Sequence, residues 1–176
     1  TIEFVYPETH DVLPGYNPVI RASENELEEV AKLINAAKNP VILAGHGVLL
    51  SGATYELTTL AEKADIPVAV TLLGIGGIPA SHPKCIGFMG MHGGYWVNHA
   101  IQEADLLIAC GMRFDDRVTG KLETYSPNSK KIHIDIDPTE LNKNIIVDVG
   151  IRGDLKAVLT AALPKIKETK HDAWSD

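Results

Sequence analysis

The chain has 176 residues, enough for one ordinary domain or slightly more, so a complete multidomain enzyme is not expected in this length. Hydrophobic residues make up 45% and charged residues 22%, which predicts a packed core and argues against a disordered chain. The formal net charge of -7 would repel a phosphate backbone, so nucleic acid is not expected as a partner.

Neither the cysteines nor the apolar runs indicate a special class of protein. Cys85 and Cys110 lack CxxC spacing, which argues against a disulfide framework or a zinc ribbon and favours a reducing compartment. No apolar run approaches the ~20 residues that span a bilayer, and the first residues do not resemble a signal peptide. A soluble protein without a membrane partner is expected.

The predicted elements begin after a lead-in. Residues 1–20 contain three prolines and a glycine without periodicity, so we expect an extended lead-in or interdomain linker there. Ser23 and Glu26 have the spacing of a capping box. Apolar residues recur at helical spacing over 27–37, which predicts a helix that ends before the Asn-Pro pair at 39–40.

Short apolar runs then alternate with amphipathic segments. The runs predict strands at residues 40–44, 66–71, 85–89, 106–110, 131–136 and 145–149. Helices are predicted at 54–64, at 95–103, as a short turn at 139–143, and after Gly153-Asp154, where Leu155, Val158, Leu159, Ala162 and Ile166 share one face. Because strands that alternate with helices pair in parallel, the expected fold class is α/β, a doubly wound, mainly parallel six-stranded sheet flanked by helices.

The domain prediction follows from these elements. We expect one central domain over residues 21–168 and a C-terminal tail over 169–176 that leads toward a further domain. The residues from Lys165 onward are rich in charge, and this end of the chain is expected to fray.

A ligand is expected beyond the carboxyl ends of the strands, where the strand order reverses. If the first and fourth strands are neighbours, the loops concerned begin at Gly45 and Gly111. Gly45-His46-Gly47 resembles a loosened dinucleotide fingerprint, in which glycines let backbone amides approach a pyrophosphate, although a tight turn without a ligand explains it equally well. No carboxylate follows the second strand, which disfavours the standard recognition of NAD.

Acidic residues occur at the end of a later strand instead. Asp135 and Asp137 fall on one side of that strand by period-two alternation, so one of them could accept ribose hydroxyls. Asp137 could equally cap the short helix predicted after it. A magnesium site built from the aspartates is disfavoured, because nothing in their spacing specifies one.

The segment from Arg113 to Arg117 is the densest charged cluster of the chain. An arginine fork can hold a carboxylate or a phosphate, and a neighbouring aspartate can fix its angle, but a solvated loop with weak ion pairs is at least as consistent with the pattern. His92 could approach the crevice or serve only as a structural hydrogen-bonding residue. No nucleophile is apparent, since Cys110 lies within a predicted buried strand.

Several segments together resemble the central domain of the acetolactate (acetohydroxyacid) synthase catalytic subunit, a thiamine-diphosphate-dependent enzyme. They are residues 71–74, 87–93, 111–120 (GMRFDDRVTG), 133–138 (HIDIDP) and Gly153-Asp154. The resemblance covers nearly the whole chain from about Tyr6 to the last helix. It implies a Rossmann-like middle domain, one of three domains in the complete enzyme.

The same resemblance implies an FAD laid along this domain, bound without net redox in the synthase reaction. Its adenosine and pyrophosphate would meet Gly45, His46, Gly47, Gly111, Arg113, Asp135, Ile136 and Asp154, and its ribityl and flavin parts would meet Thr71, Leu72, Gly90, Met91, His92, Asp115 and Val118. Arg117 matches a catalytic arginine that orients the carboxylate of the second 2-oxo acid, with Asp116 steering it. His46 departs from the family, in which many members have glycine.

The complete enzyme implied by the resemblance condenses two pyruvates, or pyruvate and 2-oxobutyrate, with loss of CO2 in branched-chain amino-acid biosynthesis. Its thiamine diphosphate and Mg2+ belong to flanking domains, so these domains, further copies of the chain in a homo-oligomer and a regulatory small subunit are the expected partners. The cytoplasm, or an organellar stroma or matrix in a eukaryote, is the expected location, and the isolated domain is expected to be inactive. Two alternatives remain, namely a stand-alone adenine-nucleotide-binding regulatory module and a structural domain without a cofactor.

Overall fold

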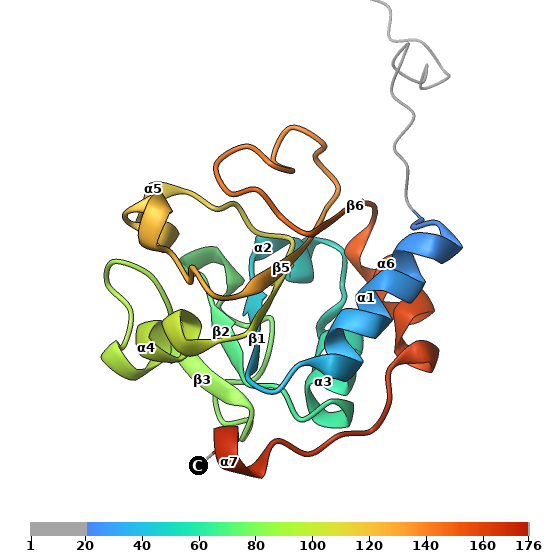
Figure 1. The fold of residues 1–176 in the computed structure, drawn as a ribbon, viewed down its shortest axis with the longest axis horizontal. Helices are drawn as coiled ribbons and strands as arrows, with labels where there is room; N and C mark the ends of the chain where they lie inside the picture. The colour runs from blue at the N-terminus through green and yellow to red at the C-terminus, as the bar shows by residue number, and fades with distance from the viewer. Residues whose placement is uncertain (1–20, 176) are drawn as a thin grey trace, which may run out of the picture.

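The computed structural model describes residues 21–175, so the linker predicted over residues 1–20 lies outside the described part (Figure 1). The described chain has three layers, with a sheet between two sets of helices. One face of the sheet carries α1 (Glu24–Ala36), α3 (Thr54–Lys63) and α6 (Leu155–Ala162), and the other carries α4 (Tyr95–Glu103). Within residues 21–175 no helix combines the length and the apolar character needed to cross a membrane.

The sheet has six strands, and every pair of neighbours is parallel. The strands are β1 (Pro40–Ala44), β2 (Val68–Val70), β3 (Cys85–Phe88), β4 (Leu106–Cys110), β5 (Lys130–Asp135) and β6 (Val149–Arg152). Their order is β3-β2-β1-β4-β5-β6, so the direction of winding reverses between β1 and β4. This confirms the predicted α/β fold, and it confirms that the first and fourth strands are neighbours.

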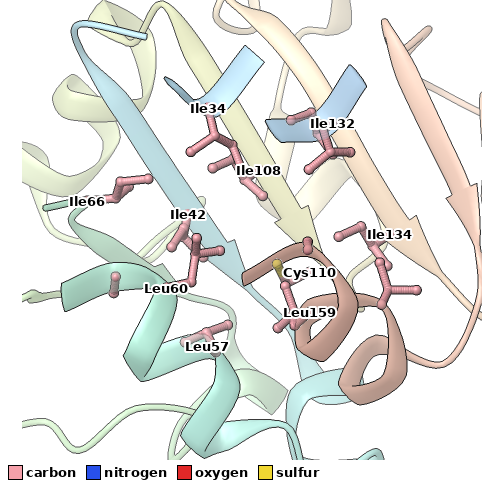
Figure 2. Close-up of a cluster of buried hydrophobic side chains, with 14 of the residues drawn as sticks. Ile34, Ile42, Leu57, Leu60, Ile66, Ile108, Cys110, Ile132, Ile134 and Leu159 are labelled. Atoms are coloured by element: carbon pink, nitrogen blue, oxygen red, sulfur yellow. The ribbon is translucent and has the colours of Figure 1, made fainter. Parts of the chain in front are cut away.

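The inner strands β1, β2 and β4 form because their side chains are buried on both faces of the sheet. Period-two alternation divides these side chains between two cores. Ile42 and Ile108 point to the α1, α3 and α6 face, where they meet Leu57 and Leu159 of the helices (Figure 2). Leu43, Leu107 and Ala109 point to the α4 face, where they join Val97, Ile101, Met112 and Phe114. The strand ends are therefore held rigidly from both sides.

The helix starts agree with the predicted caps. The Ser23 amide donates to Glu26 Oε2 at 2.7 Å, and the Glu26 amide donates back to Ser23 Oγ at 3.4 Å, which completes the predicted capping box. Asp154 caps α6 by accepting from the Ala157 amide at 2.9 Å. The predicted apolar face of this last helix is buried, although regular α-helix ends at Ala162 and a 3-10 turn, η3 (Leu163–Lys165), follows.

Two predictions between β5 and β6 are wrong. The short helix predicted at 139–143 is a series of turns, because Asp137 Oδ1 accepts from the Thr139 amide and hydroxyl at 2.8 and 2.7 Å and fixes a local turn. The strand predicted at 145–149 begins only at Val149. Ahead of it, the Val147 amide bonds to Asn142 Oδ1 at 2.9 Å and Ile146 is 78% exposed, so this apolar run does not join the sheet.

Short elements escaped prediction because they have too few residues to show a period. They are α2 (His46–Leu50), α5 (Asp116–Thr119), α7 (Asp172–Ser175) and two further 3-10 turns, η1 (Leu72–Gly74) and η2 (Leu122–Thr124). Two of them, α2 and α5, directly follow β1 and the loop after β4. Both therefore lie at the strand ends where a ligand is expected.

The charged C-terminal segment, which was expected to fray, contacts the rest of the domain through its described residues as far as Trp174. Its backbone and side chains bond to distant parts of the domain, since the Thr169 amide donates to the Lys63 carbonyl at 3.1 Å and the His171 amide donates to Asp65 Oδ2 at 2.6 Å. Trp174 Nε1 donates to the Pro40 carbonyl at 3.0 Å, near the start of β1. The domain limits themselves, at 21 and 168, stay a prediction.

Candidate functional site

A cleft of about 810 Å3 lies over the carboxyl ends of the strands, at the point where the strand order reverses. This volume falls in the range of ~300–1,000 Å3 that is typical of small-molecule sites. The cleft is lined by His46, Gly47, Leu50, Ser51, Thr71, Leu72, Leu73, Phe88, Met89, Met91, His92, Gly111, Met112, Arg113, Asp115, Arg117, Val118, Ile134, Asp135, Ile136, Asp154 and Leu155. These lining residues include every predicted site residue except Gly45, Gly90, Asp116 and Asp137.

Gly45 and Gly90 lie behind the cleft wall and pack against the segment after β4. A Cβ at Gly45 would lie 2.3 Å from the Gly111 carbonyl oxygen, and one at Gly90 would lie 2.4 Å from the Arg117 carbonyl oxygen. Contacts this short cannot accommodate a side chain, so both positions need glycine for the close approach of two backbones. Gly47 combines the two features, since it lines the cleft and its Cβ would lie 2.6 Å from Gly111 Cα.

Two backbone amides of the glycine loop, those of Gly45 and Gly47, are already used within the protein. The Gly45 amide donates to the Cys110 carbonyl at 3.0 Å, and the Gly47 amide donates to the Gly111 carbonyl at 2.9 Å. These bonds join the ends of β1 and β4 across the switch point. The side chains of His46 and Arg113, both of which are exposed in the cleft, are the cationic or polar donors that remain for an anionic ligand beside this junction.

The charged side of the cleft is the segment from Gly111 to Arg117. Met112 and Phe114 are buried in the α4-side core, while Arg113 and Asp115, which alternate with them in the sequence, line the cleft. Asp115 is the N-cap of α5 and accepts from the Arg117 and Val118 amides at 3.1 and 3.2 Å. Its other oxygen lies 3.5 Å from Arg113 Nη2. One carboxylate thus orders the short helix and orients an arginine.

Arg117 stands at the mouth of the cleft with most of its guanidinium free. Its side chain is 71% exposed, with Nε 3.9 Å from Asp116 Oδ2 and Nη1 3.7 Å from Met91 Sδ. Such exposed ion pairs contribute little to stability, about 0–1 kcal/mol. Two cationic forks, from Arg113 and Arg117, are therefore available to an anionic group in the cleft.

The acidic residues have separate environments. Asp135 at the end of β5 is partly buried and lines the cleft, and burial raises the pKa of its carboxyl above the ordinary value. One of its oxygens accepts from the Asp137 amide at 2.9 Å. Asp137 itself is exposed and does not line the cleft, and because turns follow it in place of the expected helix, its carboxylate fixes a local turn and does not cap a helix as the alternative interpretation expected. Asp154 lines the cleft while it caps α6.

The sequence interpretation missed eight of the lining residues, all of them apolar apart from Ser51. The missed residues are Leu50, Ser51, Leu73, Phe88, Met89, Met112, Ile134 and Leu155. Six of these directly neighbour predicted residues in the sequence or end a strand, which is a signal that could have found them. Leu50 and Ser51 had no such signal because α2 was not predicted. Leu50, Leu72 and Leu73 are 76%, 67% and 60% exposed, an unusual concentration of apolar surface beside a cleft.

Groups that could perform covalent or metal chemistry are not assembled at this cleft. Burial raises the pKa of Cys110 to about 12, so its thiol is inert. Among residues 21–175 there is no group of three or more histidine, cysteine, aspartate or glutamate side chains that could hold a metal ion. The described part of the cleft is equipped to bind and orient a ligand.

Comparison with known proteins agrees with this geometry. The family model of the thiamine pyrophosphate enzyme central domain matches residues 27–162. The chain is 50% identical over 166 residues to an acetolactate synthase of Mycobacterium avium and 46% identical over 171 residues to an acetolactate synthase large subunit of Corynebacterium glutamicum, which covers 94% and 97% of this chain. It is 47% identical over 165 residues, 92% of its length, to a probable acetolactate synthase large subunit of Methanocaldococcus jannaschii.

The chain spans 26–28% of the length of these relatives. The matched region contains all the strands and the whole cleft, from α1 to the end of α6. The predicted resemblance to the middle domain of acetolactate synthase is therefore confirmed. From its fold, its cleft and the family model that it matches, the chain belongs to the family of thiamine pyrophosphate enzyme central domains.

Proposed function

We propose that this chain is the FAD-binding central domain of an acetolactate synthase catalytic subunit. The observation that carries the proposal is the cleft of about 810 Å3 at the switch point between β1 and β4, in which a charged side faces an apolar side. A dinucleotide that ends in a flavin has the same division, since its pyrophosphate is anionic and its ring system is flat and largely apolar. The similarity to acetolactate synthases supports this choice of ligand.

The residues present fit such a ligand when each part is matched to its chemistry. Arg113 and His46 would hold the pyrophosphate, because the amides of Gly45 and Gly47 are already bonded within the protein. Asp135 would accept ribose hydroxyls, which suits a partly buried carboxylate at a strand end. The exposed apolar side chains of Leu72 and Met91 would cover the flavin, whose role would be structural because no net redox is implied.

The activity belongs to a longer protein that contains this domain. Thiamine diphosphate is the cofactor of the family, and in the proposal it is held with Mg2+ by flanking domains. That enzyme would condense two pyruvates, or pyruvate and 2-oxobutyrate, with loss of CO2. Arg117 at the mouth of the cleft would orient the carboxylate of the second 2-oxo acid, and Asp116, whose carboxylate lies 3.9 Å away, would steer the guanidinium.

The remaining parts of the proposal concern assembly. The chain alone would be inactive, because the cleft binds and orients but assembles no metal or nucleophile among its described residues. Its partners would be the flanking domains, further copies in a homo-oligomer and a regulatory small subunit. It would act in the cytoplasm, or in an organelle if the source is eukaryotic.

A flavin titration of the chain tests the first step. We expect saturable quenching of FAD fluorescence at one site per chain, with ADP as a weaker competitor because it offers only part of the ligand. Failure to bind at any accessible FAD concentration would show that this domain does not suffice for the site. Tight binding of ADP or NAD without any preference for the flavin would favour the alternative, a stand-alone adenine-nucleotide-binding module.

A further inference from the structure

We propose that His133 and Asn144, which do not line the cleft, are positioning residues that hold the arginine-bearing segment Gly111–Arg117 in place. His133 Nε2 lies 2.8 Å from the Met112 carbonyl oxygen, and Asn144 Nδ2 donates to the Phe114 carbonyl oxygen at 2.7 Å. Both side chains come from other elements, β5 and the loop before β6. The proposal rests on the proposed function only for the identity of the ligand that Arg113 meets.

The carbonyl partner determines how His133 is used. A carbonyl oxygen only accepts, so Nε2 must carry the proton and donate it to Met112. Burial lowers the pKa of the ring, which keeps it neutral, and Nδ1 is then an acceptor with no hydrogen-bond partner among the described residues. The side chain is fully buried and lies edge-on to Phe114, with ring centroids 5.1 Å apart.

Packing alone does not explain why position 133 is a histidine, because burying its ring is energetically unfavourable. Position 133 is an interior strand position between Ile132 and Ile134, where a β-branched apolar side chain would fill the same role in the sheet. A buried ring nitrogen without a partner is unfavourable. The histidine provides the hydrogen bond to the Met112 carbonyl, which an apolar residue could not form.

The two bonds act on alternate residues of one segment. The carbonyls of Met112 and Phe114 are fixed from the side of β5 and β6, while the side chains of Arg113 and Asp115, which come next in each case, line the cleft. The segment is anchored at its ends by backbone bonds, from the Gly47 amide to the Gly111 carbonyl at 2.9 Å and from the Met91 amide to the Arg117 carbonyl at 2.8 Å. His133 and Asn144 therefore secure the part between these anchors, which carries the first arginine.

Substitutions that remove only the donor test the proposal in the 176-residue chain. His133→Met introduces an apolar side chain of similar size without a donor, whereas His133→Gln keeps an N–H donor. Asn144→Ala removes the second donor from an exposed position, where the fold should tolerate it. Asn35→Ala is the matched control, because Asn35 Nδ2 also donates to a backbone carbonyl, that of Lys165 at 3.1 Å, on the opposite side of the domain from the segment.

Two readouts separate positioning from ligand identity. Trypsin cleavage after Arg113 and Arg117, followed by mass spectrometry, reports the mobility of the segment without any ligand, and FAD titration reports the cleft. We expect His133→Met and Asn144→Ala to be cleaved several-fold faster and to bind FAD about tenfold more weakly. His133→Gln should restore both values toward those of the unchanged chain, and Asn35→Ala should alter neither.

Three results would overturn the proposal. These are cleavage and affinity unchanged in both donor-removal variants, equal effects in Asn35→Ala, or no rescue by His133→Gln. If His133→Met does not fold, as shown by a lost thermal transition, Asn144→Ala at its exposed site decides the question. If the unchanged chain binds no FAD, this domain does not suffice for the proposed FAD site, while the cleavage rates still confirm or overturn the positioning role.

Discussion

The two sides of the cleft are built on different principles. On the β4 and β5 side, Arg113, Asp115 and Asp135 carry charge, and the backbone beneath them is bonded at nearly every step. On the β2 side, Leu72 and Leu73 stand more than half exposed on a single 3-10 turn after the strand. A directional ligand group needs fixed partners, whereas an apolar ring needs only covered area. The difference indicates which half of a ligand each side receives.

The largest expected effect comes from breaking the backbone junction that supports the charged side. Gly45→Ala places a Cβ 2.3 Å from the Gly111 carbonyl oxygen and 2.4 Å from Met112 Cβ, so the segment must move or the chain must strain. We expect a loss of about 1–3 kcal/mol in the free energy of unfolding, measured by urea denaturation. Gly150→Ala is the control, because its nearest atom would be Val147 Cγ2 at an ordinary 3.5 Å. Equal losses in the two variants would contradict the prediction.

Removing a charge at the mouth of the cleft should affect catalysis and spare the fold. In a longer enzyme that includes the flanking domains, Arg117→Ala should lower kcat/KM for acetolactate formation roughly 10- to 100-fold, the range for loss of a charge-assisted bond. The melting temperature and FAD content should stay nearly unchanged, because the side chain is 71% exposed. Lys121→Ala, at an exposed cation that does not line the cleft, should change none of these. A parallel fall in stability would assign Arg117 to the fold.

A substitution on the apolar side of the cleft should change ligand affinity and leave stability nearly unchanged. Leu72→Ser removes apolar area that is exposed in the free chain and covered when a ring binds, so FAD affinity should fall roughly tenfold. The free energy of unfolding should change by less than about 0.5 kcal/mol. Leu122→Ser, at a partly exposed leucine outside the cleft, should leave affinity unchanged. An unchanged affinity in Leu72→Ser would mean that this side does not cover the ligand.

The smallest effect is expected at Asp135. Burial raises its pKa, so the folded chain holds this proton more tightly than the unfolded chain does. The protonated carboxyl therefore adds to the free energy of unfolding at low pH. This contribution is lost as the pH rises from the ordinary carboxyl range, about pH 4, through the raised pKa of the folded chain. Asp135→Asn should therefore melt slightly higher than the unchanged chain at pH 7 and no higher at pH 3, while it binds FAD less well. Identical melting curves at both pH values would contradict this.

Prediction from sequence succeeded where burial dictates the pattern. The bounds of β1, β4 and α4 agree with the predicted ranges because continuous apolar runs or a full helical period end at a glycine or a polar residue. The apolar run at 145–147 misled the interpretation, since the Val147 amide bonds to Asn142 and the next amide, of Asp148, bonds to the Lys131 carbonyl before β6 begins. Local pattern cannot show which backbone groups have already found partners.

The same limit applies to the site. Residues that directly follow strand ends could be predicted, because all parallel strands deliver their carboxyl ends to one edge of the sheet. Gly45 was assigned to ligand contact from its loop, but in the structure its space is taken by Gly111 and Met112, more than 60 residues away in the chain. The bonds of His133 and Asn144 to Met112 and Phe114 likewise join distant segments, and no spacing within either segment encodes them.

The contact between the glycine loop and the loop after β4 also limits how this cleft can diversify. Gly45 and Gly47 are both pressed against Gly111, whereas the side chain of His46 between them is exposed and faces the cleft. In a saturation library over positions 45–47, tolerated substitutions should therefore concentrate at the middle position. Residue 46 is the place where this protein can vary its chemistry toward a ligand without disturbing the join between the two halves of the sheet.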